Sequence, residues 1–243
     1  MFRSLVFWGA LPFVGLQALR VRRLALRLQP ADGPSSGSVG SGPSLRLLAI
    51  GDSIIVGVGA STLDKALIGR TAESLAGSSG RTVDWQAIGQ SGIRSGGVLD
   101  ELLPSLPEDR VDVFLISVGV NDVTSLTRTS VWATNLDRLL CALGRHSPAA
   151  VIAFAGIPPL RDFPLLPQPL RSVIGFRGET LDRVAQRLIA AHPRALHVPV
   201  DFKTHADSFC SDGFHPSEAG YIEFGRAMAD QLVARLSDRT EGL

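Results

Sequence analysis

Residues 45–53 read Leu-Arg-Leu-Leu-Ala-Ile-Gly-Asp-Ser, an apolar run that ends abruptly in glycine, aspartate and serine. A short apolar run bounded by turn residues is typical of a buried strand. Four similar apolar runs follow further along the chain. The five runs predict strands over residues 47–50, 82–88, 113–118, 151–155 and 196–200. The third and fourth runs are continuous enough to predict central strands that are covered on both faces.

Longer amphipathic segments separate these strands. The predicted helices cover residues 64–78, 98–103, 130–145, 179–191 and 217–236. Strands that alternate with helices are typical of a parallel sheet with helices packed on both faces. The sequence therefore predicts an α/β fold, a three-layer α/β/α sandwich.

The composition is that of a globular protein. Of the 243 residues, 45% are hydrophobic and 19% charged, which is enough apolar material for a sizeable core. The net charge of +1 conceals an asymmetry, because residues 1–30 contain five arginines and no acidic residue. The remainder of the chain is therefore slightly acidic, and we expect no nucleic-acid partner.

The N-terminal segment has the pattern of a membrane anchor. Residues 5–19 are apolar but shorter than the roughly 20 residues that a spanning helix needs. Arginines follow at once, at positions 20, 22, 23 and 27, which favours a segment that lies in the membrane interface. The alternative is a helix packed on the protein's own core. The arginines favour the cytoplasmic face, and export or a periplasmic location is the alternative.

The next segment predicts a domain boundary. Residues 33–44 are almost entirely glycine, serine and proline, which bury little apolar surface. We therefore expect an anchor over residues 1–30, a flexible linker over residues 31–44 and one folded domain over residues 45–238.

The two cysteines give no sign of a metal or a disulfide. Cys141 and Cys210 lie far apart, without a CxxC pair or clustered histidines, so we expect both to be small core residues. No glycine-rich loop of the phosphate-binding type is present in the sequence. We therefore predict neither a cofactor nor a metal.

Three loops should open at one edge of the sheet. Ser53 follows the first predicted strand, residues 89–92 follow the second and residues 119–122 the third. Ligands bind at the carboxyl ends of parallel strands. An acyl-transfer enzyme needs donors for a developing oxyanion there, and a glycine N–H and an asparagine amide are suitable. Gly92 and Asn121 are the candidates, although each singly is more often a loop or capping residue.

A fourth block, Asp212-Gly-Phe-His215-Pro, precedes the last predicted helix. The spacing of three places carboxylate and imidazole on one turn, where the carboxylate orients the ring as a general base. A lone histidine before a proline is usually a surface or capping residue. We expect the other histidines to be structural, namely His146, His192, His197 and His205.

In this order, GDS, an SG loop, GxND and DxxH resemble the blocks of the SGNH (GDSL-type) hydrolase family, and the resemblance covers residues 46–236. It implies a flavodoxin-like five-stranded parallel sheet of order 2-1-3-4-5 and a serine esterase that needs no metal. The implied site residues are the triad Ser53, Asp212 and His215 and the oxyanion hole of Ser53, Gly92 and Asn121. Asp52 and Asp122 are expected to fix loops through hydrogen bonds.

Substrate choice should depend on residues 156–177, where five prolines interrupt apolar side chains. An apolar rim favours lipid-like carboxylic esters with medium or short acyl chains. A lysophospholipase-like or thioesterase-like enzyme is a further option. The segment could equally cover a sheet edge. The first alternative function is a carbohydrate O-acetylesterase, for which Trp85 and Trp132 give little aromatic support. The second is a membrane-tethered binding module without catalysis.

Overall fold

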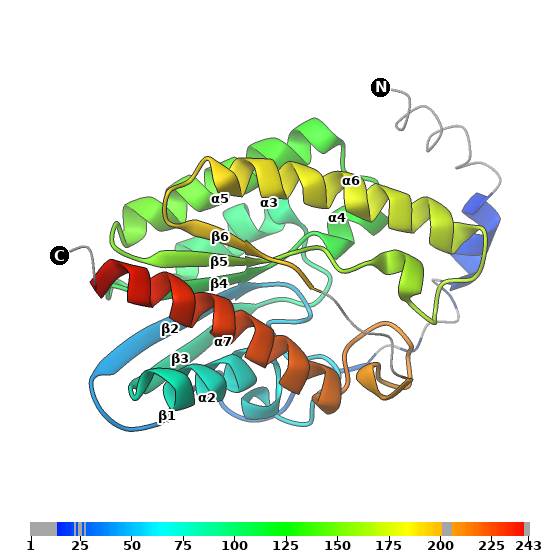
Figure 1. Cartoon of the computed structure of the whole chain (residues 1–243). Coiled ribbons are helices and arrows are strands. Elements are labelled where there is room, and N and C mark those ends of the chain that lie inside the picture. Colours follow the sequence, from blue (N-terminus) through cyan, green and yellow to red (C-terminus); the bar gives the residue numbers. More distant parts are fainter. Residues whose placement is uncertain (1–13, 22, 24–25, 27, 201–205, 241–243) are drawn as a thin grey trace.

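The computed structural model describes residues 14–21, 23, 26, 28–200 and 206–240 (Figure 1). Its centre is a six-stranded sheet of order β1-β3-β2-β4-β5-β6. The strands are β1 Ser36–Val39, β2 Ser44–Gly51, β3 Thr82–Gly89, β4 Val113–Ser117, β5 Val151–Ala155 and β6 Ala195–Val198. Strands β2 to β6 are parallel, and their order is the predicted 2-1-3-4-5.

Helices cover both faces of the sheet (Figure 1). α2 (Leu67–Ser79) packs with α7 (Glu218–Thr240) on one face, and α5 (Thr129–His146) packs with α6 (Leu170–Ala190) on the other. The remaining helical elements are short: η1 Leu63–Lys65, α3 Ser95–Gly97, η2 Val98–Leu102, η3 Leu103–Ser105, α4 Val120–Thr124, η4 Leu160–Asp162 and η5 Ala206–Ser208. The predicted three-layer sandwich is confirmed.

The core lies between the sheet and these helix pairs. Every residue of β4 and β5 is buried, as expected for central strands of a parallel sheet. Trp132 of α5 is fully buried, and its indole N–H donates to the Leu181 carbonyl of α6 at 3.0 Å. This bond satisfies the polar atom of a large apolar side chain and fixes the two helices against each other.

The sheet differs from the prediction at one edge. β1 lies within residues 31–44, which were expected to be a flexible linker, and it pairs antiparallel with β3 from Ser36 opposite Gln86 to Val39 opposite Val83. The sheet is therefore six-stranded and mixed rather than five-stranded and parallel. Small residues suit this edge because Gly37 lies against the Trp85 ring, where a Cβ would come within 2.6 Å of a ring carbon.

α6 also begins earlier than predicted, at Leu170 instead of residue 179. The prolines of residues 156–169 obscured the start of this helix, although proline is common at helix starts. The extra turns follow a helical stripe, because Leu170, Ile174 and Leu181 are all buried. The loop expected over residues 156–177 is therefore shorter and ends where α6 begins.

The helical residues 14–21 lie against the same region. Val14 is buried, and the Gln17 side chain donates to the Gln168 carbonyl at 2.8 Å and accepts from the Leu170 N–H at 3.0 Å. Of the predicted anchor, residues 1–13, 22, 24–25 and 27 lie outside the described residues. Within the part of the chain that is described, no helix combines the length and apolar character needed to cross a bilayer.

Candidate active site

Ser53 lies in the turn that follows β2, at the carboxyl edge of the sheet. Gly51 has a φ of 152°, and a Cβ at this position would come within 1.8 Å of the Ser117 carbonyl oxygen. Only glycine lets β2 and β4 approach so closely where β2 ends. The turn is fixed further on by the Val58 N–H, which donates to the Ser53 carbonyl at 2.9 Å.

His215 connects Ser53 to Asp212. Its Nε2 lies 3.1 Å from Ser53 Oγ, and its Nδ1 lies 2.6 Å from Asp212 Oδ2. A carboxylate can only accept a hydrogen bond, so Nδ1 carries the ring proton and Nε2 is free to accept from the serine hydroxyl. The two residues predicted to act on Ser53 thus lie in one hydrogen-bonded chain with it.

The carboxyl group of Asp212 is kept ionised. Burial alone would raise its pKa, but hydrogen bonds from the His215 ring and from the backbone N–H groups of His215 and Phe214 hold the pKa below its usual range. Both backbone donors reach Oδ1, at 3.0 and 2.9 Å, and leave Oδ2 to the ring. The DxxH spacing therefore lets one carboxylate fix both the turn and the imidazole.

The loops after β3 and β4 are tied together. Asn121, at the start of α4, donates its amide to the Ile93 carbonyl at 3.0 Å. The next residue, Asp122, is buried and accepts from the Ser95 N–H at 2.9 Å and from the Ser95 hydroxyl at 2.8 Å. Asn121 and Gly92 line the cavity above Ser53. The bonds of Asn121 and Asp122 fix the separation of the two loops that carry the predicted oxyanion donors.

Asp52 is a second buried carboxyl group beside the serine. It accepts from the Ile54 N–H at 3.2 Å and from the Ser117 hydroxyl at 3.3 Å. Burial raises its pKa to about 6, against the opposing effects of these hydrogen bonds and of the nearby His215. Asp52 fixes the turn as expected, but no sequence pattern predicted that its pKa would be raised.

A cavity of about 170 Å³ opens beside Ser53 and His215. Gly92 and polar residues such as Ser91 and Asn121 line one part of it. Its apolar lining comes from Val118, Val120, Ile157, Phe163, Val200, Phe214 and Phe224. The site therefore has a nucleophile candidate, a possible base, hydrogen-bond donors and an apolar compartment in one place.

A profile of the GDSL-like lipase/acylhydrolase family matches residues 49–221. The chain belongs to this family. The matched range contains all four sequence blocks, from Ser53 to His215, together with β3 to β6 and the end of β2. The resemblance inferred from the sequence is thus confirmed.

Family relatives include the GDSL-like esterase Rv1075c of Mycobacterium tuberculosis, which is 28% identical over 206 residues. The match covers 80% of this chain and 62% of that protein.

Solved structures with the same fold include a lipase/acylhydrolase from Enterococcus faecalis, with 22% identity, a TM-score of 0.62 and coverage of 79% of this chain and 96% of the other. A family 3 carbohydrate esterase from Clostridium thermocellum has 17% identity and a TM-score of 0.63, over 80% and 98% of the chains. Because these neighbours differ in the substrate class that their names give, the shared fold does not select a substrate.

Sequence reasoning missed part of the site's lining. Phe214, Phe224 and Val200 line the cavity, although the apolar rim was expected chiefly within residues 156–177. Of that rim, Ile157 and Phe163 do reach the cavity. Phe224 is on α7, and only the fold brings that helix to the carboxyl edge; the position of Phe214 beside His215 was the available signal.

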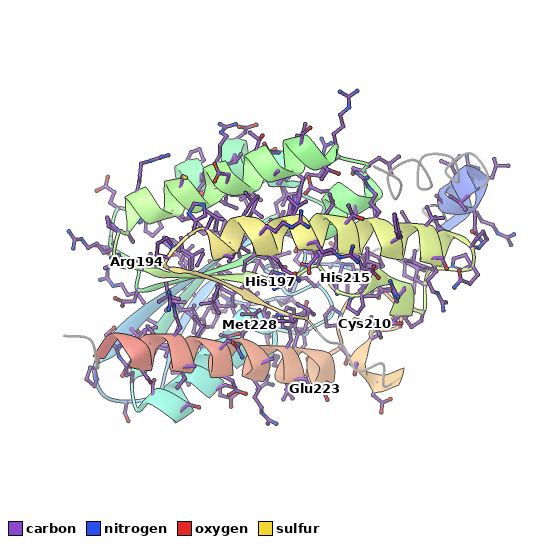
Figure 2. All side chains as sticks on the ribbon, turned by 45° about the horizontal axis from the view of Figure 1, so that its top comes forward. Arg194, His197, Cys210, His215, Glu223 and Met228 are labelled. Carbon is purple, nitrogen blue, oxygen red and sulfur yellow. The ribbon has the colours of Figure 1, made fainter. Side chains whose placement is uncertain are left out.

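The cysteine expectation also needs correction, since Cys141 and Cys210 are both half-buried rather than core residues. Cys210 lies close to the candidate site, and its thiol donates to the Pro216 carbonyl at 3.0 Å. Figure 2 shows Cys210 and His215 near the start of α7, with His197 further along the sheet. Of the other histidines, His205 lies outside the described residues.

Proposed function

We propose that this chain is a serine esterase that hydrolyses carboxylic esters through an acyl-enzyme on Ser53. The observation that carries the proposal is the chain of contacts from Ser53 Oγ through His215 to Asp212, at 3.1 and 2.6 Å. Nucleophile, base and orienting carboxylate within hydrogen-bond distance are the requirements for nucleophilic catalysis by serine. A binding module without catalysis would not need this arrangement.

In the proposed mechanism, His215 Nε2 takes the Ser53 proton while Oγ attacks the ester carbonyl carbon. The ionised Asp212 stabilises the imidazolium that forms. His215 then gives the proton to the leaving alkoxide, and the acyl group remains on Ser53. Water, deprotonated by His215, attacks the acyl-enzyme, and collapse of the second intermediate releases the acid and restores the serine.

The proposed oxyanion hole consists of the Ser53 N–H, the Gly92 N–H and the Asn121 amide. Gly92 has a φ of 81°, a conformation that favours glycine. Asn121 uses one amide N–H on Ile93, which fixes its orientation and leaves the second for the oxyanion. Donors fixed before the reaction stabilise the tetrahedral intermediate without having to reorganise.

The cavity supports an ester with a short or medium acyl chain. An engineered apolar cavity of about 150 Å³ binds benzene, so the cavity of about 170 Å³ beside Ser53 suits an acyl group of roughly six carbons. Phe163, Phe214 and Phe224 supply the aromatic surface for such a chain. Neither Trp85 nor Trp132 lines the cavity. The Trp85 ring lies against Gly37 of β1, and Trp132 is fully buried between α5 and α6.

The test is a series of p-nitrophenyl esters from two to twelve carbons, measured beside acetylated sugars. We expect kcat/KM to peak at about four to eight carbons and to fall at twelve. Phe224→Ala should move the peak to longer chains, because it enlarges the cavity. Preference for acetylated sugars would favour the carbohydrate O-acetylesterase, and no hydrolysis of any ester would contradict the proposal.

We further propose that residues 1–30 attach the enzyme to a membrane surface, with the cytoplasmic face favoured by the arginines. Leu16 and Leu19 are 81% and 53% exposed, and Arg20 and Arg23 are exposed beside them, a combination suited to an anionic lipid surface. Fractionation and protease accessibility in intact cells test both statements. A full-length chain found only in the soluble fraction would contradict the anchor, and cleavage from outside would contradict the cytoplasmic side.

A truncation for this test should remove residues 1–30 and keep residues 31–44, because β1 is part of the sheet. The Ala31 N–H also donates to the Val56 carbonyl at 2.9 Å. We expect the truncated chain to leave the membrane fraction and retain esterase activity.

A further inference from the structure

We propose that Asp137, Cys141 and His192 form a Zn²⁺ site, which is independent of the proposed esterase activity. One carboxylate oxygen, the thiol sulfur and one ring nitrogen of these residues all lie within 4.8 Å of one another. Two of these ligands come from α5 and the third from the turn after α6. The sequence does not reveal the site, because His192 lies more than fifty residues from Asp137 and Cys141.

The three side chains project from well-fixed backbone. Asp137 and Cys141 are one helical turn apart, so they lie on the same face of α5. In the turn between α6 and β6, the His192 N–H donates to the Ile189 carbonyl and the Ala195 N–H donates to the His192 carbonyl, each at 3.0 Å. The backbone therefore needs no rearrangement to present the three ligands to one ion.

The spacing is close to that of a tetrahedral zinc centre. Zinc–ligand bonds of about 2.0 to 2.3 Å place neighbouring ligand atoms roughly 3.3 to 3.5 Å apart. His192 Nε2 is already 3.2 Å from Asp137 Oδ1. The remaining pairs, which are at most 4.8 Å apart, can close through small side-chain rotations.

The ligand chemistry selects zinc over hard cations. A thiolate and an imidazole suit Zn²⁺, whereas Mg²⁺ and Ca²⁺ prefer oxygen ligands only. On binding, Zn²⁺ replaces the Cys141 thiol proton, which passes to solvent, and the two anionic ligands neutralise the ion. A surface ion pair of Asp137 and His192 would account for their contact but not for the thiol beside them.

Exposure allows an ion to enter. Cys141 is half-buried, and the side chains of His192 and Asp137 are 25% and 53% exposed. Water can therefore supply the fourth ligand of the tetrahedron. Such a centre would cross-link α5 to the turn that leads into β6.

The site is remote from Ser53. Arg194, in the same turn as His192, and His215 lie at opposite ends of the sheet in Figure 2. We therefore assign the zinc a stabilising role, and its ligands can be changed without touching the esterase machinery.

The experiment is a Zn²⁺ titration of the full-length protein after chelator treatment, with the melting temperature as readout. Zn²⁺ at about a hundredfold excess over its Kd should raise the melting temperature by roughly 5 to 10 °C. Cys141→Ser and Asp137→Asn should reduce this shift to about 1 °C or less. Asp230→Asn, which removes an exposed carboxylate on α7, should keep the full shift, and ester hydrolysis should be unchanged in all variants.

Peptide-level alkylation by iodoacetamide provides a readout in the unmutated protein. Zn²⁺ should slow labelling of Cys141 at least tenfold and leave Cys210 unaffected; burial raises the pKa of Cys210 to about 11, so that thiol reacts slowly in either case. An equal temperature shift in Cys141→Ser would overturn the proposal. So would unchanged alkylation of Cys141 in the presence of Zn²⁺.

Discussion

Two histidine–aspartate pairs lie near the carboxyl edge of the sheet, and only one has the surroundings for catalysis. His215 Nδ1 is 2.6 Å from Asp212, and His197 Nε2 is 2.8 Å from Asp182. The second nitrogen of His215 faces Ser53 Oγ in an apolar cavity. The ring of His197 instead stacks on Phe154, with the ring centroids 6.0 Å apart.

The carboxylates of the two pairs, Asp212 and Asp182, also differ in the groups that they bind. Asp212 accepts hydrogen bonds from the backbone N–H groups of Phe214 and His215, and these bonds fix the turn that presents His215. Asp182 accepts from the Ile157 N–H at 2.8 Å and from the Gln186 amide at 2.9 Å, so it fixes α6 to the loop after β5. A partly buried histidine–aspartate pair is therefore insufficient evidence for catalysis. The group at the other ring nitrogen and the adjoining cavity distinguish the two pairs.

The largest expected effect is on the proposed catalytic pair, Ser53 and His215. Ser53→Ala and His215→Ala should each lower kcat/KM by about 10³-fold or more while thermal stability stays nearly unchanged. The double variant should be no worse than either single one, because the two residues act as a unit. Steady-state kinetics and thermal melts check this, and additive losses would show that Ser53 and His215 do not act together.

A smaller loss of activity is expected at the proposed oxyanion hole. Asn121→Ala should lower kcat by about 10² to 10³ with little change in KM, since its amide is proposed to bind the oxyanion rather than the bound substrate. Separate determination of kcat and KM tests the role. A change confined to KM would make Asn121 a substrate-positioning residue.

His197 should show the opposite profile. His197→Ala removes the Asp182 partner and the ring against which Gly156 packs, so we expect a loss of roughly 2 to 3 kcal/mol in unfolding free energy. At a temperature where the variant is folded, kcat should remain within about threefold of the original, because His197 does not contact Ser53 or line the cavity. Denaturant unfolding measures the loss of stability, and ester hydrolysis measures the change in kcat. A loss of activity as large as that of His215→Ala would contradict the structural role that we assign to His197.

The smallest effect concerns Asp52 and depends on pH. Its pKa is about 6 in the folded protein against 3.8 when unperturbed, so this group makes the folded state less stable as pH rises from about 4 to about 6. Asp52→Asn removes that dependence. The unfolding free energy of Asp52→Asn minus that of the unmutated protein should therefore be about 2 kcal/mol larger at pH 8 than at pH 4.5. A difference independent of pH would show that Asp52 ionises normally.

The sequence predicted the elements whose signal is local. The five parallel strands could be located because each is a short apolar run bounded by turn residues. The motif blocks of Ser53, Asn121 and His215 could be located because their reactive or hydrogen-bonding side chains stand in the loops that follow such runs. β1 was missed because an edge strand of glycine and serine has no apolar pattern, and its pairing with β3 is a tertiary effect.

Other features depended on residues distant in the chain. Phe224 reaches the cavity only because α7 packs over the carboxyl edge. Burial of Asp52 and the convergence of Asp137, Cys141 and His192 are also products of packing. A pattern of neighbouring residues in the sequence cannot predict contacts between residues that are distant in the chain.

The most direct test of the central claim is labelling by a fluorophosphonate probe, followed by mass spectrometry of the peptides. The probe reacts with a serine only where a base and oxyanion donors activate it. We predict one adduct, on Ser53, that disappears in Ser53→Ala, falls by at least 10²-fold in rate in His215→Ala and persists in folded His197→Ala. Labelling of another serine, or equal labelling rates in the His215 variant and the unmutated protein, would contradict the account.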